Sequence, residues 1–287
     1  MRLISYATET GSRVAGRRGD YYVDLNLTDP ELPPTMRELL RLGPAGLDRA
    51  RAAVQAGQPL EPRSLRLLAP VPDPEKVICI GLNYADHAAE SHLPTPTEPV
   101  VFNKFPTAVT GHQSPILLPA ISDQVDYEAE LVVVVGTGGR DIPESQAMQH
   151  VAGYTCGHDV SARDWQLNKS SGQWLLGKTF DTFAPMGPYL VTVDEVGDAD
   201  ALEIRLRLNG QTLQHSNTSQ LIFPIAHLIH YVSRVCTLKP GDVLFTGTPP
   251  GVGMARKPRI FLKPGDLVEV EIEKLGVLAN PVIEHKA

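Results

Sequence analysis

Two glutamates stand one residue apart where the chain reads DYEAELVVVV, at positions 126–135. Side chains alternate across a strand, so Glu128 and Glu130 are expected on one face. Two carboxylates that close raise each other's pKa unless a cation lies between them. The apolar run that follows predicts a half-buried strand, where unpaired charge is costly. A hard divalent ion such as Mg²⁺ would relieve the repulsion, whereas a solvated strand face is the commoner origin of this pattern.

A third acid is expected if these glutamates bind a metal. In the segment GYTCGHDVSARDWQ, Asp159 follows a predicted strand and is the best candidate. Ser161 and Asp164 have the spacing of a capping box, which predicts the start of a helix. On that helix Arg163 and Gln166 would share a face, and together they could bind a substrate carboxylate. The alternative for Arg163 is a surface ion pair with Asp164 or a neighbour.

Further candidate site residues lie in loops. In GLNYADHAAE, His87 and Glu90 are three apart, and a carboxylate beside an imidazole is the pairing that a general base needs. A structural or exposed histidine is the alternative. Lys178, in LLGKTFDTFAPMGP, is either a surface group or a buried cation directed at an anion. The segment TGTPPGVG, at 246–253, is either a plain turn or a loop whose backbone N–H groups bind an anion.

These residues need a scaffold, and the sequence predicts a mostly β one. KVICIG and EAELVVVVG are typical of strands, and LEIRLRLNGQTLQ indicates a hairpin that turns at Asn209 and Gly210. PIAHLIHYVSR has helical spacing. The tetrapeptide KPGD occurs twice, at 239–242 and 263–266, and each copy is expected to form a turn before a strand. Long β segments with few helices favour an α+β, mostly β protein with a mixed-sheet roll or sandwich.

The first 70 residues are predicted to form a small α/β domain. RLISY and DYYVDL are typical of short strands around a Gly/Arg turn, and TMRELLRL and AGLDRARAAVQAG have helical spacing. A cluster of prolines between Pro59 and Pro74 favours an extended linker. We therefore expect an N-terminal domain of residues 1–70 and a catalytic domain of residues 71–287.

Composition excludes several classes of protein. The net charge is -7, so a nucleic-acid partner is not expected. The longest aliphatic run, 131–135, is too short to span a membrane, and the first residues lack the pattern of a signal or transit peptide. Three cysteines at no metal-like spacing are interpreted as reduced thiols, which predicts a cytoplasmic protein. The motifs of dinucleotide-binding, P-loop and α/β-hydrolase enzymes are absent.

Taken together and in this order, the motifs resemble the fumarylacetoacetate hydrolase family. The resemblance covers residues 70–280, and it is carried by these segments: GLNYADHAAE, DYEAELVVVVG, GYTCGHDVSARDWQ, GKTFDTFAPMGP, LNGQTLQHSNTSQLIF, TLKPGDVLFTGTPPGVG and FLKPGDLVEVEIEKLGVLAN. HDVSARDWQ, GKTFDTF and the RKP before the final FLKPGD resemble the subgroup of fumarylacetoacetate hydrolase domain-containing protein 2. Residues 1–70 resemble the variable N-terminal domain of the family.

The resemblance implies a mixed β-sandwich roll, usually a homodimer, that binds Mg²⁺ or Mn²⁺. It places the metal ligands on Glu128, Glu130 and Asp159, the catalytic pair on His87 and Glu90, and a further catalytic residue on Lys178. Substrate-binding positions fall on Arg163, Gln166 and Thr248. The family often has asparagine before the metal-binding aspartate, where this chain has His158. A histidine there could alter hydrogen bonds around the metal and the choice of substrate.

The reaction implied is metal-dependent hydrolysis of a C–C bond in a small 2,4-dioxo acid of the acylpyruvate or fumarylpyruvate type, through a metal-bound enolate. His87, held by Glu90, would activate the water, and Lys178 would stabilise the developing charge. The same chemistry serves oxaloacetate keto–enol tautomerisation, which is the main alternative, as well as oxaloacetate decarboxylation and ureidoglycolate lyase-like activity. A catalytically silent metal-binding protein is the non-enzymatic alternative.

Overall fold

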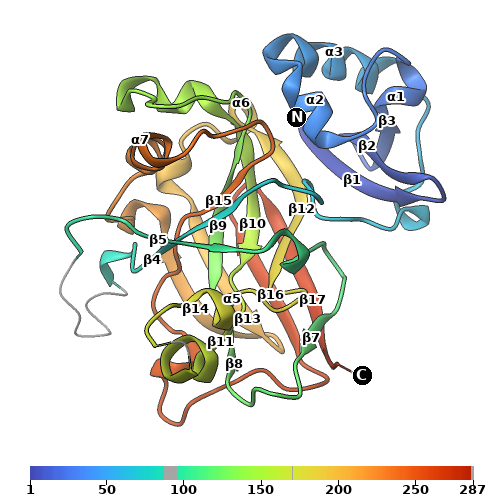
Figure 1. Cartoon of the computed structure of the whole chain (residues 1–287). Coiled ribbons are helices and arrows are strands. Elements are labelled where there is room, and N and C mark those ends of the chain that lie inside the picture. Colours follow the sequence, from blue (N-terminus) through green and yellow to red (C-terminus); the bar gives the residue numbers. More distant parts are fainter. Residues whose placement is uncertain (87–95, 170, 286–287) are drawn as a thin grey trace.

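The computed structural model describes residues 1–86, 96–169 and 171–285, and Figure 1 shows two sheets with helices around them. The ten-stranded sheet has nine strands in spatial order: β3 (Tyr21–Asp24), β2 (Gly11–Arg18), β1 (Arg2–Thr8), β12 (Ala184–Thr192), β10 (Val151–His158), β9 (Ala129–Val135), β15 (Val243–Phe245), β4 (Val77–Gly81) and β5 (Val100–Lys104). The tenth strand, β6 (Val109–Thr110), pairs with β12.

The second sheet has five strands, and a short ladder lies beside the two sheets. The five strands in order are β14 (Gln211–Asn217), β13 (Glu203–Leu208), β16 (Leu267–Ile272), β17 (Gly276–Glu284) and β7 (Ile116–Leu118). The ladder joins β8 (Val125–Asp126) to β11 (Ser161–Ala162). The α-helices are α1 (Leu25–Thr28), α2 (Met36–Arg41), α3 (Gly43–Ala56), α5 (Leu175–Lys178), α6 (Val193–Val196) and α7 (Ile225–Val235).

Strand β9 explains how the two sheets form one core. Its Leu131 and Val133 pack with Ile204 and Val270 of the smaller sheet, so this face of the large sheet is the inner face of a sandwich. On the opposite face, Val132 packs in a second cluster with residues of α2 and α3. A strand that is buried on both faces must be apolar throughout, which accounts for the continuous LVVVV run. The predicted mixed β-sandwich with more strand than helix is confirmed.

The N-terminal unit continues the large sheet. Strand β1 pairs antiparallel with β12, so residues from both sides of the domain boundary predicted near residue 70 share one ladder. The prediction of a Gly/Arg turn between the first two strands is wrong, because Gly11–Arg18 forms strand β2 between β1 and β3. Pairing on both sides outweighs the low strand propensity of its glycines. A division of the chain into domains near residue 70 stays a prediction.

Other predicted elements are found as expected. Asn209 and Gly210 turn between β13 and β14, both with positive φ, as a tight hairpin requires. Helix α7 begins after Pro224 and buries its apolar stripe. In each KPGD turn the aspartate accepts a hydrogen bond from the lysine N–H three residues earlier, at 2.8 Å for Asp242 and 2.7 Å for Asp266. In the described part of the chain, no helix has the length and apolarity needed to cross a membrane.

Candidate active site

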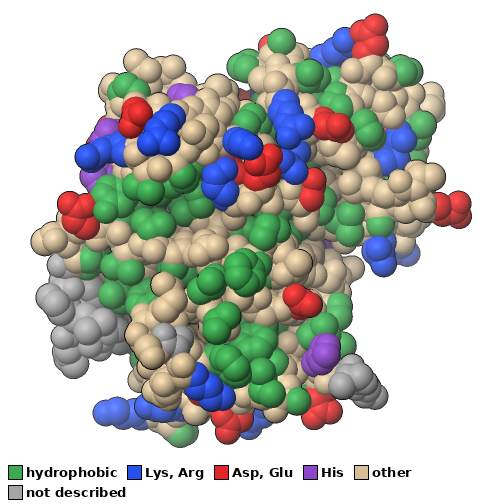
Figure 2. Space-filling view, viewed as in Figure 1, with side chains coloured by type: hydrophobic (Ala, Val, Ile, Leu, Met, Phe, Trp, Pro, Cys, Tyr) green, Lys and Arg blue, Asp and Glu red, His purple; other side chains and the backbone are tan. Residues whose placement is uncertain are grey.

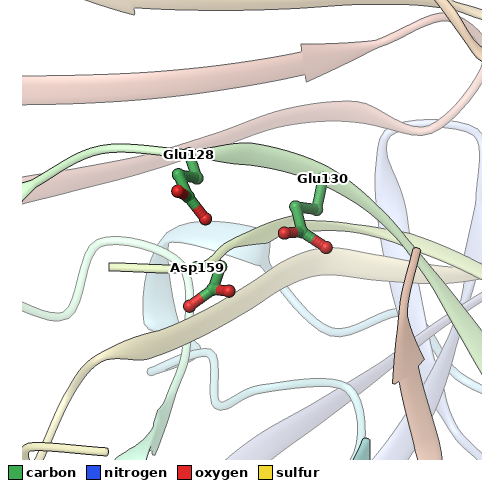
Figure 3. A group of neighbouring side chains, drawn as sticks. All are labelled: Glu128, Glu130 and Asp159. Carbon is green, nitrogen blue, oxygen red and sulfur yellow. The ribbon is translucent and has the colours of Figure 1, made fainter. Parts of the chain in front are cut away.

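Three buried carboxylates meet where β9 and β10 lie side by side. Glu128 lies just before β9, Glu130 lies on it, and Asp159 directly follows β10. One ligand oxygen from each lies within 4.8 Å of the others. Figure 3 shows the three side chains pointing toward one another from adjacent backbone segments. The Asp159 N–H donates to the Glu128 carbonyl at 2.9 Å, which fixes this arrangement across the two segments.

Two buried cations neutralise part of this cluster. Lys178, at the end of α5, donates to Glu128 at 2.7 Å and to Asp159 at 2.9 Å. Arg163 donates to Glu128 at 2.6 Å. Burial alone would raise the pKa of Glu128, but the charges of Lys178 and Arg163 outweigh it and lower that pKa to about 2. Burial likewise acts against a charged Lys178, but the charges of Asp159 and Glu128 raise its pKa. Lys178 is therefore a buried cation, and the surface alternative is wrong.

Glu130 forms no ion pair among the described residues, and the charge of Lys178 lowers its pKa too little to offset burial. Burial raises its pKa well above the ordinary value, and the negative charges of Asp159 and Glu128 raise it further. Its side chain accepts a hydrogen bond from the Gly247 N–H at 2.7 Å. A buried carboxylate that repels its neighbours is stabilised by a cation placed among them. The residues present fit a hard divalent ion, since all three donors are carboxylate oxygens, which Mg²⁺ and Mn²⁺ favour.

Arg163 is held by acids of the chain. Its Nε donates to Asp126 at 2.8 Å, and a terminal nitrogen donates to the Gln166 side-chain oxygen at 2.9 Å. It is only 5% exposed, so a surface ion pair with Asp164 is excluded. The predicted capping box is also wrong. Ser161 lies in β11 and its hydroxyl donates to the Asp159 carbonyl, while Asp164 accepts from Ser122.

Asp126 is a site residue that was not singled out from the sequence. Besides Arg163, its carboxylate accepts from the N–H groups of Gly253 at 2.7 Å and Met254 at 3.0 Å. The loop after β15 therefore uses its N–H groups to bind carboxylates of the chain itself. Asp126 lies two residues before Glu128, so the alternation that links Glu128 and Glu130 could have pointed to it.

Lys104 and Gln214 also support the acids. Lys104 is 1% exposed, and its Nζ lies 2.6 Å from Asp159 Oδ1 while it donates to the carbonyls of Val160 at 3.0 Å and Phe183 at 2.7 Å. The Gln214 amide accepts from the Ala129 N–H, between the two glutamates, at 2.8 Å and donates to Thr248 Oγ1 at 2.9 Å. No local motif distinguishes either residue, because their partners are far away in the sequence.

His158 is buried beside the acidic cluster. Burial, together with the positive charge of Lys104, lowers the pKa of its imidazole to about 3. The ring is therefore neutral at pH 7. Within the described ranges, neither ring nitrogen has a hydrogen-bond partner. Its influence on a metal ligand stays a prediction.

A pocket of about 530 Å³ opens over the acids. Residues from six parts of the chain line it, including Glu128, Glu130, Asp159, Arg163, Gln166, Lys178, Thr248, Trp174, Phe102 and Lys257. The structure thus brings together seven of the nine predicted site residues. His87 and Glu90 lie outside the described residues, so their placement stays a prediction.

The fold and the site define a β-sandwich enzyme with a small-molecule pocket over a cluster of acids. Residues 76–283 match the family profile described as fumarylacetoacetate (FAA) hydrolase C-terminal. The chain belongs to the fumarylacetoacetate hydrolase family, and its predicted resemblance to the domain-containing protein 2 subgroup is confirmed.

Relatives and solved structures support this assignment along the whole chain. The chain is 53% identical to "Oxaloacetate tautomerase fahd2, mitochondrial" of Xenopus laevis, over 99% of this chain and 90% of that protein. The solved structure of a fumarylacetoacetate hydrolase from Exiguobacterium antarcticum is 34% identical in sequence with a TM-score of 0.87, and the match covers 99% of this chain and 100% of the other. Maleylpyruvate hydrolase from Sphingobium is 30% identical with a TM-score of 0.83 and the same coverage.

These relatives correct one prediction. The Xenopus laevis protein is named as mitochondrial, and so is its Homo sapiens counterpart, which is 51% identical to this chain. The prediction of a cytoplasmic protein is therefore wrong. It rested partly on three cysteines, which are indeed free. Free thiols indicate a reducing environment but do not distinguish one reducing compartment from another.

Proposed function

We propose that the chain catalyses the keto–enol tautomerisation of oxaloacetate with Mg²⁺ or Mn²⁺ held by Glu128, Glu130 and Asp159. The observation that carries this proposal is the set of three buried carboxylates within 4.8 Å of one another at a pocket. The choice of reaction is supported by the 53% identity to a protein named oxaloacetate tautomerase. It favours the alternative reaction over C–C bond hydrolysis, which the sequence motifs had suggested first.

The metal, when bound, supplies a Lewis acid that polarises the oxygens of a 2-oxo acid. The chain supplies the geometry. Arg163 and Lys178 each donate to a different oxygen of Glu128 and so set the direction of this carboxylate. Gln166 and Thr248 line the pocket and would orient the substrate carboxylate. The amide of Gln214 holds the Thr248 hydroxyl in place.

Tautomerisation moves a proton between carbon 3 and the oxygen on carbon 2 of oxaloacetate. We assign the proton transfer at carbon 3 to His87, with Glu90 orienting its ring. Lys178 holds a positive charge beside the acids and would stabilise the negative charge that develops on the substrate oxygen. Its raised pKa keeps it charged at neutral pH.

Hydrolysis of a 2,4-dioxo acid is the second candidate. It is favoured by the 30% identity to a maleylpyruvate hydrolase and by a pocket of about 530 Å³, which is roomy for a four-carbon acid. Hydrolysis needs a residue that activates water, and tautomerisation does not. His87→Ala separates the two roles. If His87 serves only to activate water, the variant loses C–C cleavage and keeps tautomerisation, which would contradict the proton transfer assigned above; loss of both activities is the result that this assignment predicts.

The experiment that tests the reaction is a substrate panel with the purified protein in Mg²⁺. We expect fast conversion of enol-oxaloacetate and slower turnover of acylpyruvates, oxaloacetate decarboxylation and ureidoglycolate cleavage. Faster turnover of an acylpyruvate than of enol-oxaloacetate would make hydrolysis the main function. Metal binding without turnover of any substrate would favour the catalytically silent alternative.

We also propose a homodimer, which uses the edge of the large sheet. Strand β5 is the last strand of its sheet, and the exposed Val101, Phe105 and Val235 line a cavity of about 770 Å³ beside it. Figure 2 shows hydrophobic side chains gathered on this face, between α7 and β5 and around α5. An unpaired edge with apolar neighbours is suited to bind a second copy of the chain.

A further inference from the structure

The loop after β15 presents a lysine at the pocket. Met254 and Lys257 both line it, and Lys257 is exposed. The segment that precedes Lys257 is held by several hydrogen bonds. The Arg256 Nε donates to the Tyr127 hydroxyl and to the Gly251 carbonyl, both at 3.1 Å. Because the N–H groups of Gly253 and Met254 bind Asp126, which also binds Arg163, the loop is fixed relative to the site.

Lys257 differs from Arg163 and Lys178, two other cations of the pocket, in its ion-pair partners. Arg163 is paired with Asp126 and Glu128, and Lys178 is paired with Glu128 and Asp159. The charges of these two cations therefore neutralise acids of the chain itself. Lys257 forms no ion pair with any residue in the described ranges, although it borders the same pocket. An unpaired lysine at a pocket mouth is available to an anionic group of a ligand.

We propose that Lys257 binds the second carboxylate of a dicarboxylic 2-oxo acid and so selects dicarboxylates over monocarboxylates. The inference rests on the proposed function in one respect, namely that the first carboxylate and the 2-oxo oxygen lie toward the acids. A four-carbon diacid carries its two carboxylates at opposite ends. The end away from the acidic cluster would otherwise meet the apolar wall that includes Trp174 and Phe102. Burying a carboxylate there without a partner would be costly.

Lys257→Met tests this role, because it removes the charge and keeps much of the side-chain length. Lys263→Met is the matched control, since Lys263 is also exposed, lies in the turn before β16 and does not line the pocket. We would measure dissociation constants by calorimetry in Mg²⁺ and low salt, where exposed ion pairs are least screened. The ligands are fresh oxaloacetate and 2-oxobutyrate, in which a methyl group replaces the second carboxylate.

The wild-type protein and Lys263→Met should bind oxaloacetate about tenfold more tightly than 2-oxobutyrate, as a hydrogen bond to a charged group predicts. Lys257→Met should lose this preference and bind 2-oxobutyrate as the wild type does. An unchanged preference in Lys257→Met, equal weakening of both ligands, or no preference in the wild type would each overturn the proposal. If the preference depends on Lys257 but oxaloacetate is not tautomerised, the proposed reaction fails and the role of Lys257 stands.

Discussion

Besides the neutral His158, four acids and three bases are buried around the pocket. The four acids are Asp126, Glu128, Glu130 and Asp159, and the three bases are Lys104, Arg163 and Lys178. Each acid or base would be costly to bury alone, so the group is stable only as a network. With all four acids ionised, one negative charge is in excess, and this excess contributes to the raised pKa of Glu130. A divalent cation among Glu128, Glu130 and Asp159 would more than offset it and favour the ionised form of Glu130, which is the physical reason for expecting a metal there.

Glu130→Gln tests this balance at a single residue. The substitution removes a proposed ligand and also the repulsion among carboxylates that lie within 4.8 Å. We expect metal-free Glu130→Gln to melt at or above the temperature of the metal-free wild type. Saturating Mg²⁺ at about 100 times its dissociation constant should stabilise the wild type by about 2.7 kcal/mol and leave Glu130→Gln unchanged. Thermal unfolding with and without Mg²⁺ measures both effects. An equal rise in melting temperature for the two proteins would argue that the metal binds elsewhere.

Lys104→Met should strongly destabilise the protein, although no local sequence motif distinguishes Lys104. Lys104 lies beside Asp159 and donates to buried carbonyls of Val160 and Phe183. Its loss leaves a buried carboxylate without one of its cations, which costs about 3–5 kcal/mol. Urea unfolding measures this cost. Lys239→Met is the control, because Lys239 pairs with Glu75 at the surface and should cost less than about 1 kcal/mol. Similar costs for the two variants would contradict the network.

At this scale the sequence predicts the groups that share a local pattern. Glu128 and Glu130 were found because strand alternation places them together, and the triad was completed by a family motif. Asp126, Lys104 and Gln214 were not found. Their importance comes from partners 34 to 128 residues away, such as Thr248 for Gln214 and Met254 for Asp126, and no local spacing encodes such contacts.

Strand β4 and helix α5 meet at a glycine that sets one wall of the pocket. A Cβ atom on Gly81 would lie 2.4 Å from the Trp174 ring, so the ring packs directly on the backbone of β4. Trp174 also contacts Phe102 edge-on at 5.5 Å between ring centroids. The close approach explains why the strand ends in glycine here.

Gly81→Ala should therefore displace Trp174 and change the shape of the pocket. The chain has two tryptophans, so the displacement is expected as a shift in tryptophan fluorescence together with a severalfold rise in KM for oxaloacetate. Trp174→Leu makes room for the added methyl group. The double variant should therefore recover part of the affinity lost in Gly81→Ala. If Gly81→Ala has wild-type fluorescence and KM, the packing of this wall is not as described.

In the N-terminal unit, a partly buried ion pair joins β2 to β3. Arg13 donates to Asp24 at 2.6 Å and 2.7 Å, and the Tyr6 hydroxyl donates at 2.5 Å. Burial would raise the pKa of Asp24, but the hydrogen bonds from Arg13 and Tyr6 outweigh it and hold the pKa below its ordinary value. The unit is therefore stabilised by a charged Asp24. Sequence patterns predicted the helices of this unit but not β2, whose glycines hide a strand that its neighbours impose.

Asp24→Asn should destabilise the protein by about 2 kcal/mol at pH 7, since Arg13 loses its charged partner and keeps only its hydrogen bond to Asn26. A carboxyl group whose pKa is lowered in the folded state stabilises the protein at pH values above its unfolded-state pKa of about 3.8. This stabilisation is lost as the pH falls through the folded-state pKa. The difference between wild type and Asp24→Asn should thus narrow below pH 4. Urea unfolding at several pH values measures it. Asp20→Asn is the control, because the Asp20 side chain is 98% exposed, and it should not change the stability at any pH. A stability difference between wild type and Asp24→Asn that stays constant with pH would contradict the role of Asp24.

For the whole molecule, the edge of the large sheet predicts a homodimer. A chain of 31.2 kDa should then have a native mass near twice that value in light scattering. Val235→Asp places a charge on a side chain that is 74% exposed beside β5, and it should shift the protein toward the monomer. Leu27→Asp is the control, because Leu27 is 69% exposed but lies in α1 of the N-terminal unit. A monomeric wild type would contradict the prediction.

The central claim is that the three acids bind a divalent ion that makes the pocket a tautomerase. It is tested most directly by the rate at which metal-stripped protein converts enol-oxaloacetate as Mg²⁺ is added, with the rate in protein-free Mg²⁺ subtracted. We predict almost no activity in chelator and a saturable rise whose midpoint equals the calorimetric dissociation constant for Mg²⁺. The same rate in chelator as in saturating Mg²⁺ would contradict the account.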